Sequence, residues 1–501
     1  MLPEEAALYN EAVASSLTSG NKGNSDGLNY LDPLLAKLGE PTKFRGFIQL
    51  LRAQALNEAD RTAEAITAVE ESIRLLPGYS APLLAAADVY GYSDRPEMAA
   101  DYLMRASRLD PDVVRNFDDY DLRNLMQRLS AKRDDRRLKL VSEELLRIGW
   151  TGTRIASRSS LVEQAIKRRL ADGDVAGAQS LVPELLVPNQ SVTLLSNKAY
   201  SAVWPAIERW GGAKLQKQWK IYLSEARSRW LVSKDSHTLG DYVTALESAS
   251  LGDEIIAQAL PLFSERLDPQ RDMEMVFAVA TIAEALAQQG RWKDAHELYV
   301  RADKIWPLGS EGSALNIAIN HGRLYLFEGK PADALRAIDA AIADARKRGP
   351  TINSGALARM HGYRACILHE LGRDVDIGTS FPAAIAGMSA TSRVWLLLCL
   401  KRSAAARQVL LDALNNEAER DEAISFFQKP DDPPLPTPYA RRMRLLEDEL
   451  RKDPTLLVRV KEYGRILPFT LSEGVPVVTE VKSPPGVTAM NGPQPPSRVI
   501  L

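Results

Sequence analysis

Histidines are the residues of this sequence whose type and spacing first suggest chemistry. His361 and His369 are eight positions apart, so one face of a helix can carry both, and His321 lies in the preceding helical pattern. Three converging imidazoles would form a candidate metal site. Such a site also needs carboxylates that orient the rings, and none recurs at helical spacing beside these histidines. The sequence therefore favours structural histidines, and we expect neither a metal site nor a cofactor.

Motifs that indicate catalysis are missing from the sequence. Gly329-Lys330 is the one Gly-Lys pair, and no glycine precedes it at the spacing of a P-loop. The acidic stretch from Asp110 to Asp121 lacks the glycine and glutamate that an EF-hand loop needs. We therefore expect that the chain is not an enzyme, and residues 120–270 are the region where an unrecognised site would have to lie.

A basic and aromatic segment at 214–230 raises the question of nucleic-acid binding. On a helix, Trp219, Tyr222 and Trp230 fall on one face, whereas Lys217 and Lys220 fall on the opposite face. Stacking on bases requires rings and cations on the same surface. The segment is therefore interpreted as a core helix with a solvated basic face.

Composition agrees with a protein that does not bind nucleic acid. Lys and Arg number 63 against 65 Asp and Glu, so the net charge is −2. The two cysteines, Cys366 and Cys399, lie in apolar helical sequence, and buried free thiols are favoured over a single disulfide. A disulfide would fit a chain that functions outside the cytosol.

The beginning of the sequence has neither the basic nor the apolar region of a signal peptide. The longest apolar run, at 394–400, is far shorter than a bilayer span. We expect a cytoplasmic protein without a transmembrane segment, or a periplasmic one if a signal sequence was removed before Met1.

The elements that position these residues repeat along the chain. An amphipathic helix that contains Ala65 and ends before Pro77 is followed 34 positions later by one that contains Ala99 and ends before Pro111. Further copies show a small residue, a turn glycine and a second small residue in the same order. These copies include Ala283, Gly290 and Ala295, then Gly322, Gly329 and Ala334, then Ala365 and Gly372.

This pattern resembles the tetratricopeptide repeat family. The resemblance implies an all-α fold: a right-handed superhelix, or α-solenoid, of stacked antiparallel helical hairpins, followed by a disordered C-terminal tail. Small residues let two helices approach closely, glycine permits the tight turn, and a single hairpin cannot bury its apolar face alone. The pattern is strong at 46–113 and 276–345 and degenerate between 120 and 270.

The sequence suggests seven segments along the chain. They are an N-terminal helical and loop segment at 1–45, repeats at 46–113, degenerate Trp-rich repeats at 114–270, longer repeats at 271–428, a Pro-rich linker at 429–438, capping helices at 439–471 and a disordered tail at 472–501.

In the family, the first helix of each hairpin lines a concave groove that binds a partner. Carried over by position, the resemblance implies a groove that includes Asn316, Asn320, Arg323, Phe327, Arg359, Tyr363 and His369. The preceding unit adds Phe277, Thr281, Glu284 and Gln288. Some members clamp a terminal carboxylate with a set of Lys, Asn and Arg residues. Here only Asn320 and Arg359 match that set, so the sequence does not support such a clamp.

We therefore expect a non-catalytic scaffold that binds a peptide or partner protein in its concave groove. As an alternative occupant of that groove, the sequence offers the chain's own tail or its Pro-rich linker. The alternative function is that of an exported, envelope-side protein that assists the assembly or transport of a polymer or surface component.

Overall fold

The structure is a computed structural model of the chain. It describes residues 25–38, 41–59, 61–115, 117–264, 267–269, 272–310, 312–349, 352–378, 380–429 and 435–475. These residues form helices joined by turns, and among them the β-type pairing is one isolated antiparallel bridge between Asn197 and Gly464. The predicted all-α fold class is therefore confirmed. Residues 1–24 of the predicted N-terminal segment and the part of the predicted tail beyond 475 lie outside the described residues.

The described residues divide into two compact units, one that extends to Arg168 and one that begins at Arg169. The described part of the first unit consists of α2 Ser25–Lys37, α3 Lys43–Glu58, α4 Thr62–Leu75, α5 Ser80–Gly91, α6 Pro96–Leu109, α7 Pro111–Val114, α8 Asp119–Ala131, α9 Asp135–Arg147 and most of α10 Ile155–Ala171.

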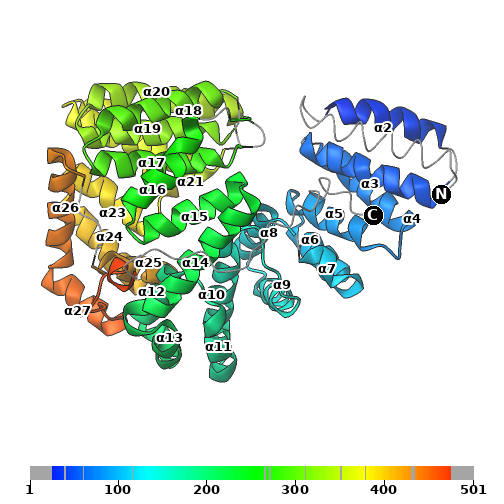
Figure 1. Cartoon of the computed structure of the whole chain (residues 1–501), viewed down its shortest axis with the longest axis horizontal. Helices are drawn as coiled ribbons and strands as arrows, with labels where there is room; N and C mark the ends of the chain where they lie inside the picture. The colour runs from blue at the N-terminus through cyan, green and yellow to red at the C-terminus, as the bar shows by residue number, and fades with distance from the viewer. Residues whose placement is uncertain are drawn as a thin grey trace. The chain divides into compact units, whose positions relative to one another are not determined.

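The second unit is larger and carries the remaining helices (Figure 1). They are α11 Val175–Leu181, α12 Pro188–Ser196, α13 Trp204–Gly211, α14 Gln216–Ser233, α15 Ser236–Ser248, α16 Gly252–Ala259, α17 Met275–Gln288, α18 Trp292–Ile305, α19 Ala314–Glu328, α20 Pro331–Arg348, α21 Ser354–Glu370, α22 Ser380–Gly387, α23 Ala390–Cys399, α24 Ser403–Asn415, α25 Arg420–Phe426, α26 Pro438–Arg451 and α27 Pro454–Tyr463.

Consecutive helices pair into hairpins such as α3–α4, α5–α6, α17–α18 and α19–α20. The small residues of the repeat pattern lie where the two helices of a hairpin meet. Ala65, Ala99, Ala295 and Ala334 are completely buried. A Cβ atom at Gly322 would lie 2.7 Å from the side chain of Ile338 on the paired helix, so only glycine fits there without a shift. The predicted role of the small residues is therefore confirmed.

Two turn glycines show why the hairpin turns need this residue. Gly290 has φ +73° and Gly329 has φ +89°, conformations that residues with a Cβ atom seldom adopt. Gly329 directly follows α19, Gly290 follows α17 after one intervening residue, and in both hairpins the second helix begins two residues after the glycine. The turn positions predicted from the repeat pattern are thus present in the structure.

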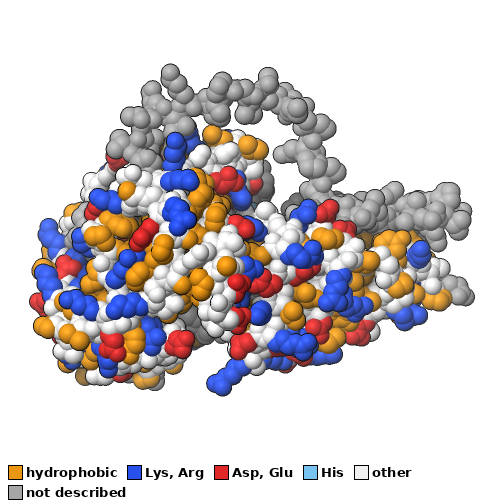
Figure 2. Space-filling view, turned by 90° about the horizontal axis from the view of Figure 1, so that it is seen from below, with side chains coloured by type: hydrophobic (Ala, Val, Ile, Leu, Met, Phe, Trp, Pro, Cys, Tyr) orange, Lys and Arg blue, Asp and Glu red, His pale blue; other side chains and the backbone are white. Residues whose placement is uncertain are grey.

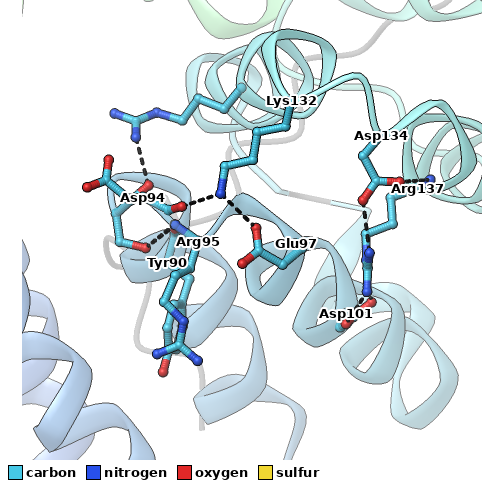
Figure 3. A network of polar contacts seen from close by, with 10 residues as sticks. Tyr90, Asp94, Arg95, Glu97, Asp101, Lys132, Asp134 and Arg137 are labelled. Atoms are coloured by element: carbon cyan, nitrogen blue, oxygen red, sulfur yellow. Dashed lines mark hydrogen bonds and ion pairs between the residues drawn. The ribbon is translucent and has the colours of Figure 1, made fainter.

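In the first unit, ion pairs join one hairpin to the next (Figure 3). Lys132 lies between the Asp94 carbonyl and the Glu97 carboxylate at the start of α6. Arg137 on α9 binds both carboxylate oxygens of Asp101 at 3.0 Å and also pairs with Asp134 at 2.9 Å. These contacts fix α8 and α9 against α6, in addition to the shared apolar core.

In the second unit, eight helices close into a ring. Each helix in the order α12, α14, α15, α17, α19, α21, α23 and α25 contacts the next, and α25 contacts α12. Figure 1 shows α12 beside α25 within this unit. A stack of hairpins is ordinarily open at both ends, so the contact between α12 and α25 is the feature of this unit that the sequence did not predict.

The segment that follows α27 packs against the Trp-rich part of the second unit and adds contacts beside the junction of α12 and α25. Arg465 donates from Nε to the Leu195 carbonyl at 2.7 Å, pairs with Glu208 at 2.9 Å, and lies 3.8 Å from the centre of the Trp204 ring system. Farther along, Trp219 donates to the Leu471 carbonyl at 2.9 Å. We call residues 464–475 the strap.

Side chains of α25 add a second set of contacts across the same junction. Asn197 donates to Asp421 at 2.6 Å, and the Tyr200 hydroxyl lies 3.0 Å from the other oxygen of the same carboxylate. A Cβ atom at Gly464 would lie 2.5 Å from the Ser196 carbonyl oxygen, so the two backbones approach closely only because position 464 is glycine.

The cysteines differ from the favoured expectation. Cys366 on α21 and Cys399 on α23 form a disulfide, with Cα atoms 5.8 Å apart, and are not two free thiols. The two helices are successive first helices of neighbouring hairpins, so a separation close to one repeat brings equivalent positions side by side. Within the described ranges, no helix is long and apolar enough to cross a membrane.

Ring closure predicts that Arg465→Ala destabilises the second unit. The substitution removes two hydrogen bonds and one cation–π contact, so the expected loss is about 2 kcal/mol of unfolding free energy. Hydrogen exchange at the Arg465 amide, which donates to the Ser196 carbonyl at 2.8 Å, reports opening of the strap directly.

The matched control is Arg459→Ala, which removes an exposed ion pair with Glu462 within α27 and should leave the unfolding free energy close to that of the wild type, because solvent screens such pairs. Equal effects of the two substitutions would contradict a closing role for the strap.

Candidate functional site

A cavity of about 970 Å³ lies within the second unit. The ring helices α15, α17, α19, α21 and α23 line it, together with α16 and α26. Its volume is in the range of pockets that enclose a small ligand or a few side chains of a partner. The cavity therefore is the candidate binding site of this unit.

Four of the predicted groove residues line this cavity. Arg323 and Phe327 come from α19, and Arg359 and Tyr363 come from α21. In both helices the two residues are four positions apart, which places them on one face. From α17, the cavity also includes the expected residues Thr281, Glu284 and Gln288.

The other predicted groove residues are not among the residues that line the cavity. Asn316 lies in the first turn of α19, where its side chain donates to the Ser313 carbonyl at 3.2 Å. Asn320 lies one turn further along α19. His369 pairs with Asp374 at 2.7 Å and lines a separate surface pocket with Phe381 and Arg402. Their proposed contact with a partner stays a prediction.

The floor of the cavity contains an ion pair between neighbouring first helices. The Arg323 guanidinium on α19 binds the Glu284 carboxylate on α17 and lies 5.7 Å from the centre of the Phe327 ring. Burial lowers the pKa of Arg323, but the negative charge of Glu284 outweighs it and leaves the pKa above its ordinary value. Arg323 is thus fixed by the fold and stays charged.

Aromatic side chains form the apolar part of the floor. Tyr363 on α21 and Trp395 on α23 meet edge to face, with ring centres 5.3 Å apart. Phe327 makes the same kind of contact, also at 5.3 Å, with Tyr439 on α26. Phe327, Tyr363 and Trp395 are half-buried, and aromatic surface that is partly open in this way is a usual anchor point for a partner's hydrophobic side chain.

Helix α26 covers one side of the cavity because it crosses three first helices. It contacts α19 and α23, and its Arg442 pairs with Glu370 on α21 at 2.5 Å. Tyr439, at its first turn, is buried and lies with its hydroxyl 3.4 Å from the Cys399 sulfur. Burial raises the pKa of Tyr439. Helix α26, which belongs to the segment predicted as an end cap, therefore forms a wall of the site.

Two charged side chains at the cavity lack internal partners. Arg359 is exposed, and its guanidinium makes no hydrogen bond or ion pair with any part of the chain that the structure describes. The same holds for the half-buried Glu254 on α16, across α17 and α19 from Arg359. These two groups are available to a charged ligand.

Two of the five histidines, His296 and His321, form a stacked cluster away from this cavity, and His361 and His369 do not belong to it. His321 on α19 stacks on Tyr299 and Tyr325, with ring centres 4.6 and 4.4 Å apart. Its Nε2 lies 3.0 Å from Nδ1 of His296, whose Nε2 lies 2.6 Å from the Glu328 carboxylate. Burial, with the nearby charge of His296, lowers the pKa of His321 to about 4. In the described residues, no group of three or more potential ligands is arranged to hold a metal ion.

The first unit carries a smaller polar cluster on its own first helices. Asp88 on α5 accepts a hydrogen bond from Asn57 on α3 at 3.3 Å, and Tyr92 donates to Asp121 on α8 at 2.6 Å. Burial and the neighbouring Asp121 raise the pKa of Asp88 to about 7. The hydrogen bonds in this cluster link neighbouring hairpins.

The basic and aromatic segment folds as the sequence predicts. Trp219, Tyr222 and Trp230 of α14 are buried, whereas Lys217 and Lys220 are exposed. On the molecular face drawn in Figure 2, basic and acidic side chains are interspersed. The interpretation of 214–230 as a core helix is therefore confirmed.

No protein-family model matches the chain, and no curated protein matches it in sequence. Among solved structures, it is similar to yeast Tom70, with 14% identity over 92% of this chain and 99% of that chain and a TM-score of 0.30. It is also similar to the TPR domain of P58(IPK), with 13% identity over 74% of this chain and 99% of that chain and a TM-score of 0.20. A third similarity is to human IFIT1, with 15% identity over 72% of this chain and 77% of that chain and a TM-score of 0.27. These similarities are distant, and the fold assignment rests on the helices described above.

The histidine cluster predicts an acid-sensitive stability. The pKa of His321 is below that of an unfolded histidine, so the native state binds fewer protons there, and its contribution is lost as pH falls from about 6.5 to about 4. Melting temperature measured across this range should fall further for the wild type than for His321→Phe, which keeps the ring stacking without the titrating group. Parallel curves for the two proteins would contradict this assignment.

Proposed function

We propose that this chain is a non-catalytic interaction scaffold whose second unit binds a segment of a partner protein in the cavity. The observation that carries the proposal is the combination at one site of an aromatic floor, Tyr363 and Trp395, with a cation, Arg359, that has no partner in the described part of the chain. Buried aromatic and arginine side chains are the residue types that dominate protein interfaces energetically.

The form of the cavity supports a short segment more than a whole domain. Rigid first helices hold its floor, and α26 covers one side. A volume of about 970 Å³ accommodates a few side chains and their backbone. The partner would insert an extended stretch or a terminus, as in other cases where helices present a groove to a peptide.

The experiment is affinity capture with the full chain from extracts of its own cells. Arg359→Glu reverses the free charge and Tyr363→Ala removes part of the floor, so each should reduce recovery of a bound partner at least tenfold. The matched control is Arg346→Glu, another exposed arginine of the second unit, which lies on the outer helix α20 and away from the cavity.

Each variant must first show the helical content and melting temperature of the wild type. A partner recovered equally by the wild type and by both cavity variants would place the binding surface elsewhere. Loss of the partner in the control as well would mean that net charge, and not the cavity, governs capture.

The disulfide favours a second candidate function, that of an exported, envelope-side scaffold. Cys366 and Cys399 are both completely or almost completely buried and bridged, and disulfides persist mainly in oxidising compartments. If the protein is exported, alkylation of unreduced protein taken directly from cells should leave both cysteines unmodified, and fractionation should place it outside the cytosol. Two alkylated cysteines under denaturing conditions without reductant would contradict export.

A further inference from the structure

The unpaired charges at the cavity differ in sign from one side to the other. Among the residues that the structure describes, Glu254 on the α16 side has no partner, and the neighbouring Asp253 accepts only an amide hydrogen bond from Gln289 at 2.5 Å. On the α21 side, the free group is the Arg359 guanidinium. Successive contacts from α16 to α17, α19 and α21 place the two sides apart, with the floor between them.

The floor between the two sides is electrically balanced. Arg323 and Glu284 neutralise one another by their ion pair, and next to them lie the rings of Phe327 and Tyr363. A segment that crosses the cavity from α16 to α21 therefore passes a negative region, then a neutral apolar region, then a positive region. The negative region draws further charge from Asp253, whose amide partner leaves its carboxylate uncompensated.

We infer that the cavity selects a segment of the partner that carries an apolar anchor residue between one basic and one acidic side chain. The basic side chain would meet Asp253 and Glu254, the anchor would meet the rings of Tyr363 and Trp395, and the acidic side chain would pair with Arg359. This inference rests on the proposed function, and it specifies the chemistry of the partner.

Charge complementarity is the physical ground for this selection. A segment with two acidic flanks would set one carboxylate against Glu254, and a segment with two basic flanks would set one cation against Arg359. Like charges brought together across an interface suppress binding of the wrong partner. Because both charged sides are partly solvated, each mismatch should reduce affinity about fivefold at low salt, and less as salt rises.

The test uses capped nonapeptides with a central leucine or phenylalanine and charged residues two, three or four positions from it. Three classes are compared by fluorescence anisotropy with the full chain: one lysine and one glutamate, two glutamates, and two lysines. The class with mixed charge should bind tightest by about fivefold over each of the others. Both orders of the mixed charges are included, because an extended segment can lie in either direction.

Two charge-reversal variants make the test specific to the named residues. Arg359→Glu should shift the preference to the peptides with two lysines. Glu254→Lys leaves Asp253 acidic and cancels the charge of that side, so it should abolish the advantage of the mixed class over the peptides with two glutamates. Arg346→Glu, the control on α20, should keep the preference of the wild type. Both cavity substitutions are at side chains without internal partners, so the fold is expected to tolerate them.

The outcomes separate this inference from the proposed function. Binding of all three classes with equal affinity, together with loss of binding in Tyr363→Ala, would overturn the charge selection and leave the cavity as a peptide site. Preferences that do not change in the two reversal variants would also overturn it. If no class binds at all, both the inference and the cavity as a peptide site are wrong.

Discussion

The contact between α25 and α12, sealed by the strap, is the constraint on which the second unit depends. Arg465 lies on Trp204 and binds the carbonyl of Leu195, while Asn197 and Asp421 join the same two layers. Without these contacts the helices would form an open stack, in which each hairpin is held only by its neighbours. With them, every ring helix has a neighbour on both sides, and α26 is held across the first helices that form the cavity floor.

The same closure explains the composition of the middle of the chain. Trp204 and Trp219 lie in a region whose repeat pattern is degenerate, and both contact the strap. Where the two helices of one hairpin pack closely, the side chains between them must be small or aliphatic. A side chain that packs against a segment from elsewhere in the chain can be large. The irregular sequence of this region thus reflects contacts with the other end of the unit.

Local features of the structure could be predicted from the sequence, and distant contacts could not. Gly290 and Gly329 at turns and Ala295 at a helix crossing follow from a repeat that recurs along the chain, and Arg359 followed from its position in that repeat. Asn197 and Asp421 are 224 residues apart and belong to no repeat, so no spacing reveals their contact. Trp395 and Tyr439 were missed at the site for the same reason.

Closure also determines how the cavity can deform. An open stack of hairpins is easily deformed, because small rotations at each interface between hairpins add up and widen or narrow its concave face. When the two ends of the stack are joined through α12 and α25, one interface between helices can open only if another is compressed. The contacts of the strap therefore limit how far the cavity can widen or narrow, so its width should vary less than that of the groove in an open stack.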